Sequence, residues 1–228
     1  SDILNVKCEV IVNAAKNDLL GGGGIDGIIH AKAGIELQNK CRALPVKGKD
    51  EKGFDIRCHT GECEVTDTDR TNLVNDFRYV FHTVGPDCRK ENDMNLNAKR
   101  LKSCYENVVQ KVLEKDVKTI AFCCISTGVY KYPRKDAAKI AYETVTSWLE
   151  KNHQSVEKVI FCTFEKDDYD AYIDLHDAHV PKSSVIINDD TSNDLSSYNP
   201  TEHFPVPSTS NTNESDSVSN LSRSEIYN

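Results

Sequence analysis

Apolar and polar positions follow two different periods along the chain, up to about residue 179. Short apolar runs typical of buried strands alternate with longer segments whose apolar residues recur every three to four positions, as in amphipathic helices. The predicted strands are 8–13, 61–66, 79–84, 119–125 and 158–164. The predicted helices are 25–44, 96–113, 137–149 and 169–175. The polar, turn-rich stretch 45–57 between them is predicted to be a loop.

Buried strands that alternate with helices indicate an α/β domain, in which helices cover both faces of a largely parallel sheet. We assign this domain to residues 1–179. The composition then changes, because 23 of the last 48 residues are Ser, Asn or Thr. Such a segment buries too little apolar surface to offset its ordering entropy. We therefore expect residues 180–228 to be a disordered, acidic tail.

Charge and cysteine content narrow the function. The formal net charge is −8, and the last 48 residues hold seven acidic and two basic residues, which argues against direct nucleic-acid binding. The charge balance does not exclude the binding of one small anion by backbone N–H groups. The nine cysteines include no CxxC pair, which favours reduced thiols and no metal site. Without an apolar run of membrane length or an export signal, we expect an intracellular protein, nuclear and/or cytoplasmic, with no membrane partner.

Four consecutive glycines, 21–24, lead into the first predicted helix. Gly22, Gly24 and Gly27 match a dinucleotide-binding fingerprint in form, but the strand ending in an acid that should follow is replaced by the polar loop. A Walker A motif is excluded, because no Gly-Lys-Ser/Thr follows. Two interpretations remain. The glycines expose N–H groups at a helix N-terminus, which suits a phosphate, or they form a tight turn that packs the helix on the sheet.

A second loop of similar character is STGVYKYP, 126–133, which follows the apolar strand 119–125. Ser, Thr and Gly after a parallel strand again present N–H groups at the carboxyl end of the sheet, where ligands of open α/β folds bind. Alone this is an ordinary loop between a strand and a helix. Together with the glycines it predicts a clamp for a diphosphate.

Six segments, in chain order, resemble the macrodomain family, most closely its MacroD-type branch: VNAA, LLGGGGIDGIIHAKAG, TGECEVT, FHTVGP, ISTGVYKYP and VIFCTF. The resemblance covers about residues 2–176. It implies a three-layer α/β/α macrodomain with a mostly parallel mixed sheet and an ADP-ribose cleft. It also implies hydrolysis of mono-ADP-ribose from acidic side chains of proteins, and deacetylation of O-acetyl-ADP-ribose, without a cofactor or metal. The implied partners are ADP-ribose or O-acetyl-ADP-ribose and mono-ADP-ribosylated proteins.

The same resemblance implies roles for individual residues. Asp26 is the matched catalytic acid, with His30 its neighbour one helical turn later. Asp2 would bond the adenine amino group, Ile3 would line that pocket, and Phe164 would stack near the adenine. Asn13 would brace the first loop. The diphosphate and the distal ribose would be held by Gly22, Gly23, Gly24, Ile25, Ser126, Thr127, Gly128, Val129 and Tyr130.

The chemistry of these residue types leaves alternatives open. Asp26 and His30 lie on one helix face at i and i+4, yet an early helical Asp commonly complements the dipole and a lone His is commonly structural. Bound phosphates would disfavour an ionised Asp26, whereas nearby N–H groups would favour it.

The chain also departs from the family pattern. Lys16 stands where the family motif VNAAN has its last Asn, and we expect it to pair with Asp26 or with phosphate. Lys131 stands where relatives often have glycine, and 45–57 is an insertion. The strand that normally precedes Asp2 is missing, which predicts an unpaired sheet edge. Lys16 therefore raises a rival to a hydrolase, a non-catalytic ADP-ribose reader. A degenerate domain that serves as a scaffold for the acidic tail is a third interpretation.

Overall fold

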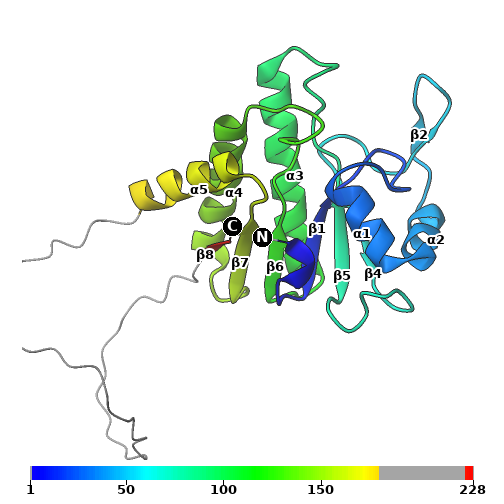
Figure 1. Cartoon of the computed structure of the whole chain (residues 1–228), viewed down its shortest axis with the longest axis horizontal. Coiled ribbons are helices and arrows are strands. Elements are labelled where there is room, and N and C mark those ends of the chain that lie inside the picture. Colours follow the sequence, from blue (N-terminus) through cyan, green and yellow to red (C-terminus); the bar gives the residue numbers. More distant parts are fainter. Residues whose placement is uncertain (1, 180–223, 228) are drawn as a thin grey trace, which may run out of the picture. The chain divides into compact units, whose positions relative to one another are not determined.

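A computed structural model describes residues 2–179 and 224–227 (Figure 1). The strands are β1 (Val10–Ala14), β2 (Gly48–Lys49), β3 (Asp55–Ile56), β4 (Cys63–Asp67), β5 (Tyr79–Thr83), β6 (Thr119–Phe122), β7 (Lys158–Cys162) and β8 (Ser224–Tyr227). The helices are α1 (Ile25–Ala33), α2 (Ile35–Ala43), α3 (Met94–Glu114), α4 (Arg134–Asn152) and α5 (Lys166–His179), preceded by the short 3₁₀ helix η1 (Ile3–Asn5).

One six-stranded sheet forms the middle layer, in the order β4-β5-β1-β6-β7-β8. Only the β4–β5 pair is antiparallel, and β1, β5, β6, β7 and β8 pair in parallel. The apolar residues of β1 and β6 are buried because helices cover both faces of these inner strands. The predicted mixed, mostly parallel sheet is thus confirmed.

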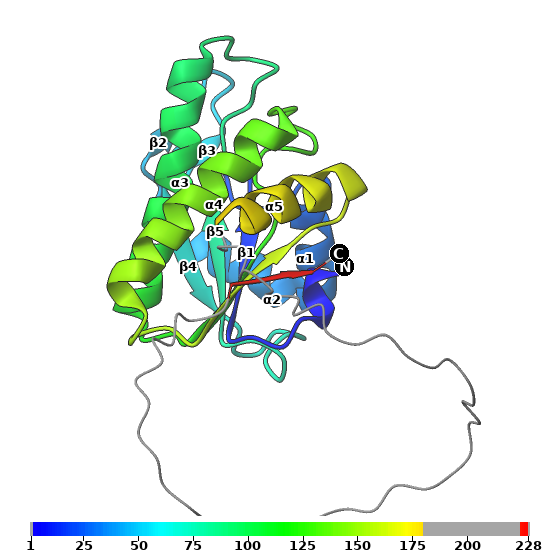
Figure 2. The ribbon, with the colours of Figure 1, turned by 90° about the vertical axis from the view of Figure 1, so that its left-hand side faces the viewer.

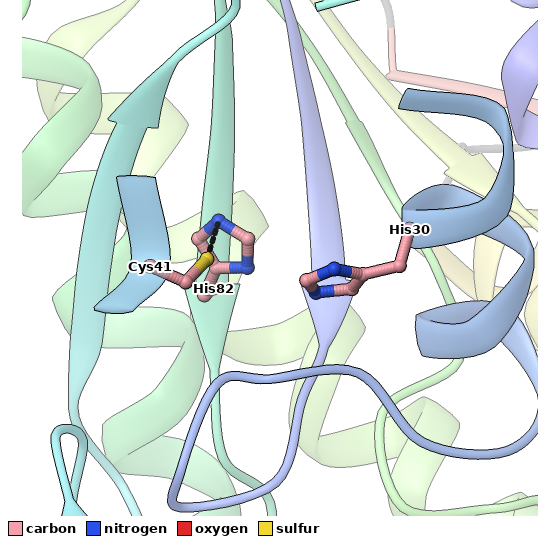
Figure 3. Close-up of side chains that lie close together, drawn as sticks. All are labelled: His30, Cys41 and His82. Atoms are coloured by element: carbon pink, nitrogen blue, oxygen red, sulfur yellow. Dashed lines mark hydrogen bonds between the residues drawn. The ribbon is translucent and has the colours of Figure 1, made fainter. Parts of the chain in front are cut away.

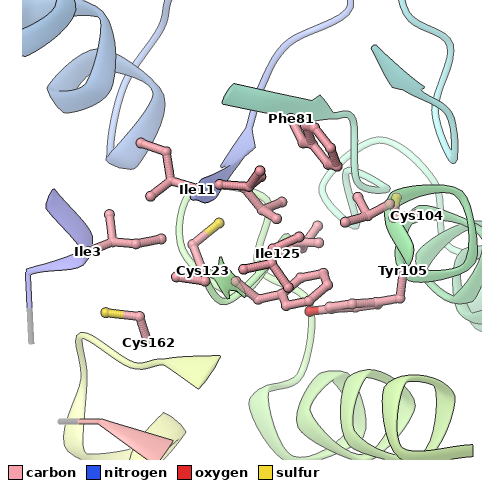
Figure 4. Packing of buried hydrophobic residues seen from close by; sticks show 14 of the residues in the cluster. Ile3, Ile11, Phe81, Cys104, Tyr105, Cys123, Ile125 and Cys162 are labelled. Carbon is pink, nitrogen blue, oxygen red and sulfur yellow. The ribbon is translucent and has the colours of Figure 1, made fainter. Parts of the chain in front are cut away.

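The helices form the two outer layers. The connections β5–α3–β6 and β6–α4–β7 both run toward the β7 side of the sheet, so right-handed crossovers place α3 and α4 on one face. The connection from β1 to β5 runs the opposite way and places α1 and α2 on the other face. Figure 2 shows this separation, with α5 beside α4. Ile11, Phe81, Tyr105 and Ile125 are fully or almost fully buried in the hydrophobic core (Figure 4), in which Ile11 and Phe81 extend from opposite faces of the sheet. No helix in the described ranges is long and apolar enough to cross a membrane.

The predicted helix 25–44 is wrong in one respect, because it is two helices that meet at Gly34. Gly34 has φ 83°, in the left-handed region that glycine adopts without strain. Its N–H closes α1 on the carbonyl of His30, and the carbonyl of Ala33 accepts from the N–H of Asn72. The chain therefore turns at this residue although the apolar spacing continues through it.

Two further predictions need correction. The stretch 45–57 contains the short antiparallel pair β2–β3, in which Gly48 faces Ile56, rather than only loop. The predicted strand 119–125 ends as β6 at Phe122, because the following residues already belong to the loop at the carboxyl edge. The remaining strands and helices match the predicted segments within a few residues. The helix predicted at 169–175 is longer at both ends, because α5 begins at Lys166 and ends at His179.

The C-terminal segment gives a different result from the one expected. Most of the predicted disordered tail, 180–228, lies outside the described residues. Ser224–Tyr227, however, form β8, which pairs in parallel with β7 from Val159 to Cys162. The sheet edge that we expected to be unpaired is therefore covered, and a strand from the end of the chain covers it.

Candidate active site

Two adjoining cavities open at the carboxyl ends of β1, β6 and β7. One, of about 320 Å³, is lined by residues of both predicted phosphate loops together with Asp26 and Lys16. The other, of about 370 Å³, contains Asp2, Ile3 and Phe164. Both are lined by Gly24, Ile25, Cys124 and Gly128, so they form one continuous cleft over the two loops.

This cleft brings together the predicted site residues from four distant parts of the chain. Three of them, Asn13, Gly22 and His30, do not line either cavity. All the others contribute to its wall, which means that the two loops do face each other as the clamp hypothesis requires.

The glycine loop ends at Gly24, which has φ 62° and is the N-cap of α1. Gly22, Gly23 and Gly24 are exposed, and a Cβ on Gly23 or Gly24 would meet nothing within 4 Å. A Cβ on Gly27, by contrast, would approach the carbonyl oxygen of Gly22 closer than 3.0 Å. Gly27 therefore serves the packing of loop on helix, whereas the exposed glycines leave backbone N–H groups open at a helix N-terminus.

The second loop is held in a strained backbone conformation. Ser126 and Lys131 have φ 67° and 58°, which L-residues rarely adopt. A side chain on Gly85 would collide with the Ser126 hydroxyl, so the absence of a Cβ there allows the turn. The Ser126 oxygen is buried and has no hydrogen-bond partner among the described residues. Lys131 at positive φ gives the physical reason why glycine is favoured at this place.

Asp26 is buried beneath the glycine loop, with 1% of its surface exposed. Its Oδ1 accepts a hydrogen bond of 2.8 Å from the Asn13 amide. Its Oδ2 lies 3.0 Å from where a Cβ of Gly22 would stand, and within the described residues it has no partner. Burial raises the pKa of Asp26, and this effect outweighs the opposing hydrogen bond from Asn13. Asn13 therefore braces the carboxylate at the start of α1.

His30 follows Asp26 one turn later on α1. Its Nε2 lies 3.5 Å from Asp26 Oδ1, and neither ring nitrogen makes a hydrogen bond with the described residues. Burial lowers the pKa of His30 more than the neighbouring Asp26 raises it, so the ring is neutral at pH 7. The expected proximity to Asp26 is present, with the imidazole available as a neutral donor or acceptor.

Lys16 does not pair with Asp26. Its Nζ lies 3.3 Å from Asp18 Oδ2, and its aliphatic stem covers Gly22. Its positive charge still opposes the rise in the pKa of Asp26. The departure from the family motif thus places a cation at the wall of the cleft, paired with a carboxylate that sequence reasoning had not considered.

The second cavity has an apolar character. Ile3 is buried at its base, and the side chain of Asp2 caps η1 by accepting from the N–H of Leu4 at 3.0 Å. Phe164 is 83% exposed at the rim. An exposed aromatic ring beside an apolar pocket is suited to stacking with a flat ring. The roles predicted for these residues toward adenine stay predictions.

Sequence reasoning did not single out His82, which is fully buried on β5 (Figure 3). Ligand atoms of His30, Cys41 and His82 lie within 4.8 Å of one another. The geometry does not prepare them for a metal, because both ring nitrogens of His82 already have hydrogen-bond partners: Nδ1 lies 3.1 Å from the Asn13 amide nitrogen, and Nε2 lies 2.9 Å from Thr66 Oγ1. Burial raises the pKa of the Cys41 thiol to about 12, so it stays protonated. Only the motif FHTVGP marked His82 in the sequence.

Arg89 is a second residue of the cleft that was missed. Its guanidinium forms two hydrogen bonds of 2.8 Å to Asp87 and lies 5.5 Å from the centre of the Tyr130 ring. The N–H of Cys88 bonds the carbonyl of Tyr130, which joins this segment to the second phosphate loop. This one segment therefore contacts both the backbone and the ring of Tyr130, which lines the first cavity.

The fold and the cleft define a three-layer α/β/α domain of the macrodomain class. The sequence model of the Macro domain family matches residues 12–141. This chain belongs to the Macro domain family.

Individual relatives agree with this assignment. ADP-ribose glycohydrolase MACROD2 of Xenopus laevis is 40% identical over 171 residues, 75% of this chain and 37% of the relative. The chain thus matches little more than a third of that protein. The Oceanobacillus iheyensis macrodomain with ADP is 35% identical with TM-score 0.67, covering 78% of this chain and 87% of that one. The Trypanosoma brucei macrodomain in complex with ADP-ribose is 33% identical with TM-score 0.63, covering 76% and 65%.

Proposed function

We propose that the cleft binds ADP-ribose, with the diphosphate between the two loops. The exposed backbone of Gly22, Gly23 and Gly24 at the N-terminus of α1 supplies N–H donors and the positive end of a helix dipole. Ser126–Tyr130 supply the opposite side. The macrodomains of Oceanobacillus iheyensis and Trypanosoma brucei, whose structures contain ADP and ADP-ribose, support the choice of ligand.

The two cavities give this ligand a direction. Adenine is placed in the apolar cavity beside Asp2, Ile3 and Phe164, because its flat ring suits the exposed aromatic side chain. The distal ribose then lies in the other cavity, beside Asp26 and Tyr130. This direction brings the bond to be broken toward the carboxylate.

We further propose that the chain hydrolyses mono-ADP-ribose from acidic side chains of proteins and deacetylates O-acetyl-ADP-ribose. In both reactions water is added across an ester, releasing a carboxylic acid and ADP-ribose. The observation that carries this proposal is Asp26 Oδ2, a buried carboxylate oxygen beside the loop that has no hydrogen-bond partner among the described residues. A carboxylate whose pKa is raised by burial is a better base for orienting and deprotonating water. The relatives named ADP-ribose glycohydrolase support this reaction class.

A non-catalytic ADP-ribose reader is the alternative, and Lys16 is the residue that favours it. A flexible ammonium replaces a neutral amide that can both donate and accept. Lys16, however, contacts Asp18 rather than Asp26, so in the part of the chain that the structure describes no lysine or arginine is bonded to Asp26. The hydrolase is therefore the function that the geometry supports better.

One experiment separates these functions. A protein mono-ADP-ribosylated on acidic side chains is incubated with the chain, and released ADP-ribose is measured by mass spectrometry. Release that is lost in Asp26→Asn, which preserves the shape of the side chain, supports the hydrolase. Calorimetric ADP-ribose binding without release, with release restored by Lys16→Asn, would support the reader. Undetectable binding would refute both.

We place this activity inside the cell, in the nucleus and/or cytoplasm, on mono-ADP-ribosylated proteins. The support is chemical: the cysteines form no disulfide within the described residues, and burial raises the pKa of several of the thiols to about 12. Cell fractionation with an antibody against the chain tests this placement.

A further inference from the structure

We propose that His82 is a positioning residue for the proposed hydrolysis: its ring accepts from Asn13 and so fixes the amide that aims the Asp26 carboxylate at the cleft. This inference rests on the proposed function, which assigns Asp26 to the reaction. His82 itself lies beneath the cleft and would act only through Asn13.

The register of the sheet creates this contact. Asn13 on β1 is the direct partner of His82 on the neighbouring parallel strand β5. Residues opposite each other in adjacent strands extend from the same face, here the face covered by α1 and α2. Figure 3 shows the His82 ring between Cys41 of α2 and His30 of α1. Both Asn13 and His82 are fully buried, so bulk water does not replace the contact between the Asn13 amide nitrogen and the His82 ring.

The hydrogen bonds determine which atoms carry hydrogen. An ionised Asp26 can only accept, so the Asn13 group that meets Oδ1 at 2.8 Å is its NH₂. The same nitrogen lies 3.1 Å from His82 Nδ1, and its second hydrogen points there. His82 Nδ1 must then be the acceptor, which puts the ring hydrogen on Nε2. Thr66 Oγ1 receives that hydrogen at 2.9 Å.

A neutral imidazole is required for this arrangement. Burial lowers the pKa of His82 to about 3, and the neighbouring His30 adds to this shift, so the ring is neutral at pH 7 and one of its two nitrogens keeps a lone pair. A ring hydrogen on Nδ1 would turn the Asn13 amide over. Its oxygen would then face the carboxylate oxygen of Asp26, and two acceptors would oppose each other. His82 thus selects one of the two amide orientations.

Other groups also act on Asp26 and must be held constant in a test. The charged and titratable groups that face it or His82 from the surrounding elements are Lys16, Asp18, His30, Cys41, Cys123 and Tyr130. None of these is changed in the variants below. A shift in the titration of Asp26 can therefore be assigned to the chain of hydrogen bonds through Asn13.

Two substitutions of His82 separate the effect of its hydrogen-bond acceptor from the effect of its side-chain volume. His82→Gln offers an amide oxygen that can accept from Asn13, whereas His82→Phe fills the space without an acceptor. Leu37→Val, a fully buried change on α2 outside the hydrogen-bond chain, controls for general loss of packing. Thr66→Val removes the oxygen partner of Nε2, leaving Cys41 Sγ at 3.7 Å, and is the second probe if His82→Phe fails to fold.

The first readout is independent of catalysis. Nitrogen NMR of wild-type His82 is expected to give the Nε2–H tautomer, and an Nδ1–H tautomer would overturn the proposal. Carbon NMR is expected to give a higher Asp26 pKa in His82→Phe, with His82→Gln and Leu37→Val near wild type. These results are obtained even if the chain proves not to be a hydrolase, so failure of the two proposals can be told apart.

The second readout uses the proposed reaction. We expect His82→Phe to lower kcat about tenfold, the factor that one hydrogen bond of ~1.4 kcal/mol represents, with KM little changed. The acidic limb of the pH–kcat profile should shift to higher pH, following the Asp26 pKa. Leu37→Val should lower the melting temperature and leave this limb in place. The proposal would be overturned if the acidic limb of the pH–kcat profile and the Asp26 pKa were unchanged in both His82→Phe and Thr66→Val. His82 would then serve only the packing of the core.

Discussion

The contact between the glycine loop and α1 makes Gly27→Ala the most informative single change. A methyl group at Gly27 would lie closer than 3.0 Å to the carbonyl oxygen of Gly22, whereas ordinary contact begins at 3.4 Å. The loop must therefore retreat from the helix until this contact reaches an ordinary distance. Because backbone N–H groups of this loop are the proposed phosphate donors, the retreat weakens their alignment with the ligand.

Gly27→Ala has two opposing effects on the stability of the fold, and it weakens ligand binding. Alanine gains about 1 kcal/mol over glycine inside a helix, while overpacking costs about 1–3 kcal/mol. The net loss of up to about 2 kcal/mol lowers the melting temperature by a few degrees for a domain of this size. A misaligned charge-assisted hydrogen bond is worth about 1.5–3 kcal/mol, which weakens ADP-ribose binding roughly 10- to 100-fold.

Thermal unfolding and isothermal calorimetry with ADP-ribose measure both effects, with two control variants. Gly23→Glu meets no protein atom near its Cβ and should abolish binding at unchanged stability, through bulk and repulsion in the cradle. Gly48→Ala lies in β2, also in open space, and should change neither property. Gly27→Ala that binds ADP-ribose as tightly as Gly48→Ala would refute the loop as the phosphate cradle.

Three further changes test the surroundings of the cleft. Asp26→Asn should stabilise the protein above about pH 4. Burial raises the pKa of Asp26 in the folded state above its unfolded value of about 3.9, so the wild type loses stability as the pH rises through the folded-state pKa. Urea unfolding between pH 4 and 8 measures this difference. Arg134→Met should cost about 1–3 kcal/mol at pH 7 in the same assay, because it leaves the buried Asp168 carboxylate without its partner. Removal of residues 221–228 should expose the edge of β7, lower the melting temperature and promote self-association in size-exclusion chromatography; an unchanged elution profile and melting temperature would contradict this pairing.

Much of the fold could be predicted because burial leaves a local trace. The apolar runs at 119–125 and 158–164 marked inner strands, and the helical spacing at 96–113 marked a helix whose Leu101, Tyr105 and Val108 are buried. Both phosphate loops followed from glycine and hydroxyl residues placed after such runs. Gly34 shows the limit of this reasoning, since a left-handed glycine ends a helix without interrupting its apolar period.

The sequence by itself determined the order of strands and helices, the two glycine-containing loops and the carboxylate at the start of α1, because each depends on residues near one another in the chain. Only the tertiary structure decided that β8 covers β7, that Lys16 pairs with Asp18 rather than with Asp26, and that His82 lies against Asn13. The Asn13–His82 contact joins residues 69 positions apart through the register of two parallel strands. Which strands become neighbours depends on the packing of the whole sheet, and no local pattern of side chains contains that information.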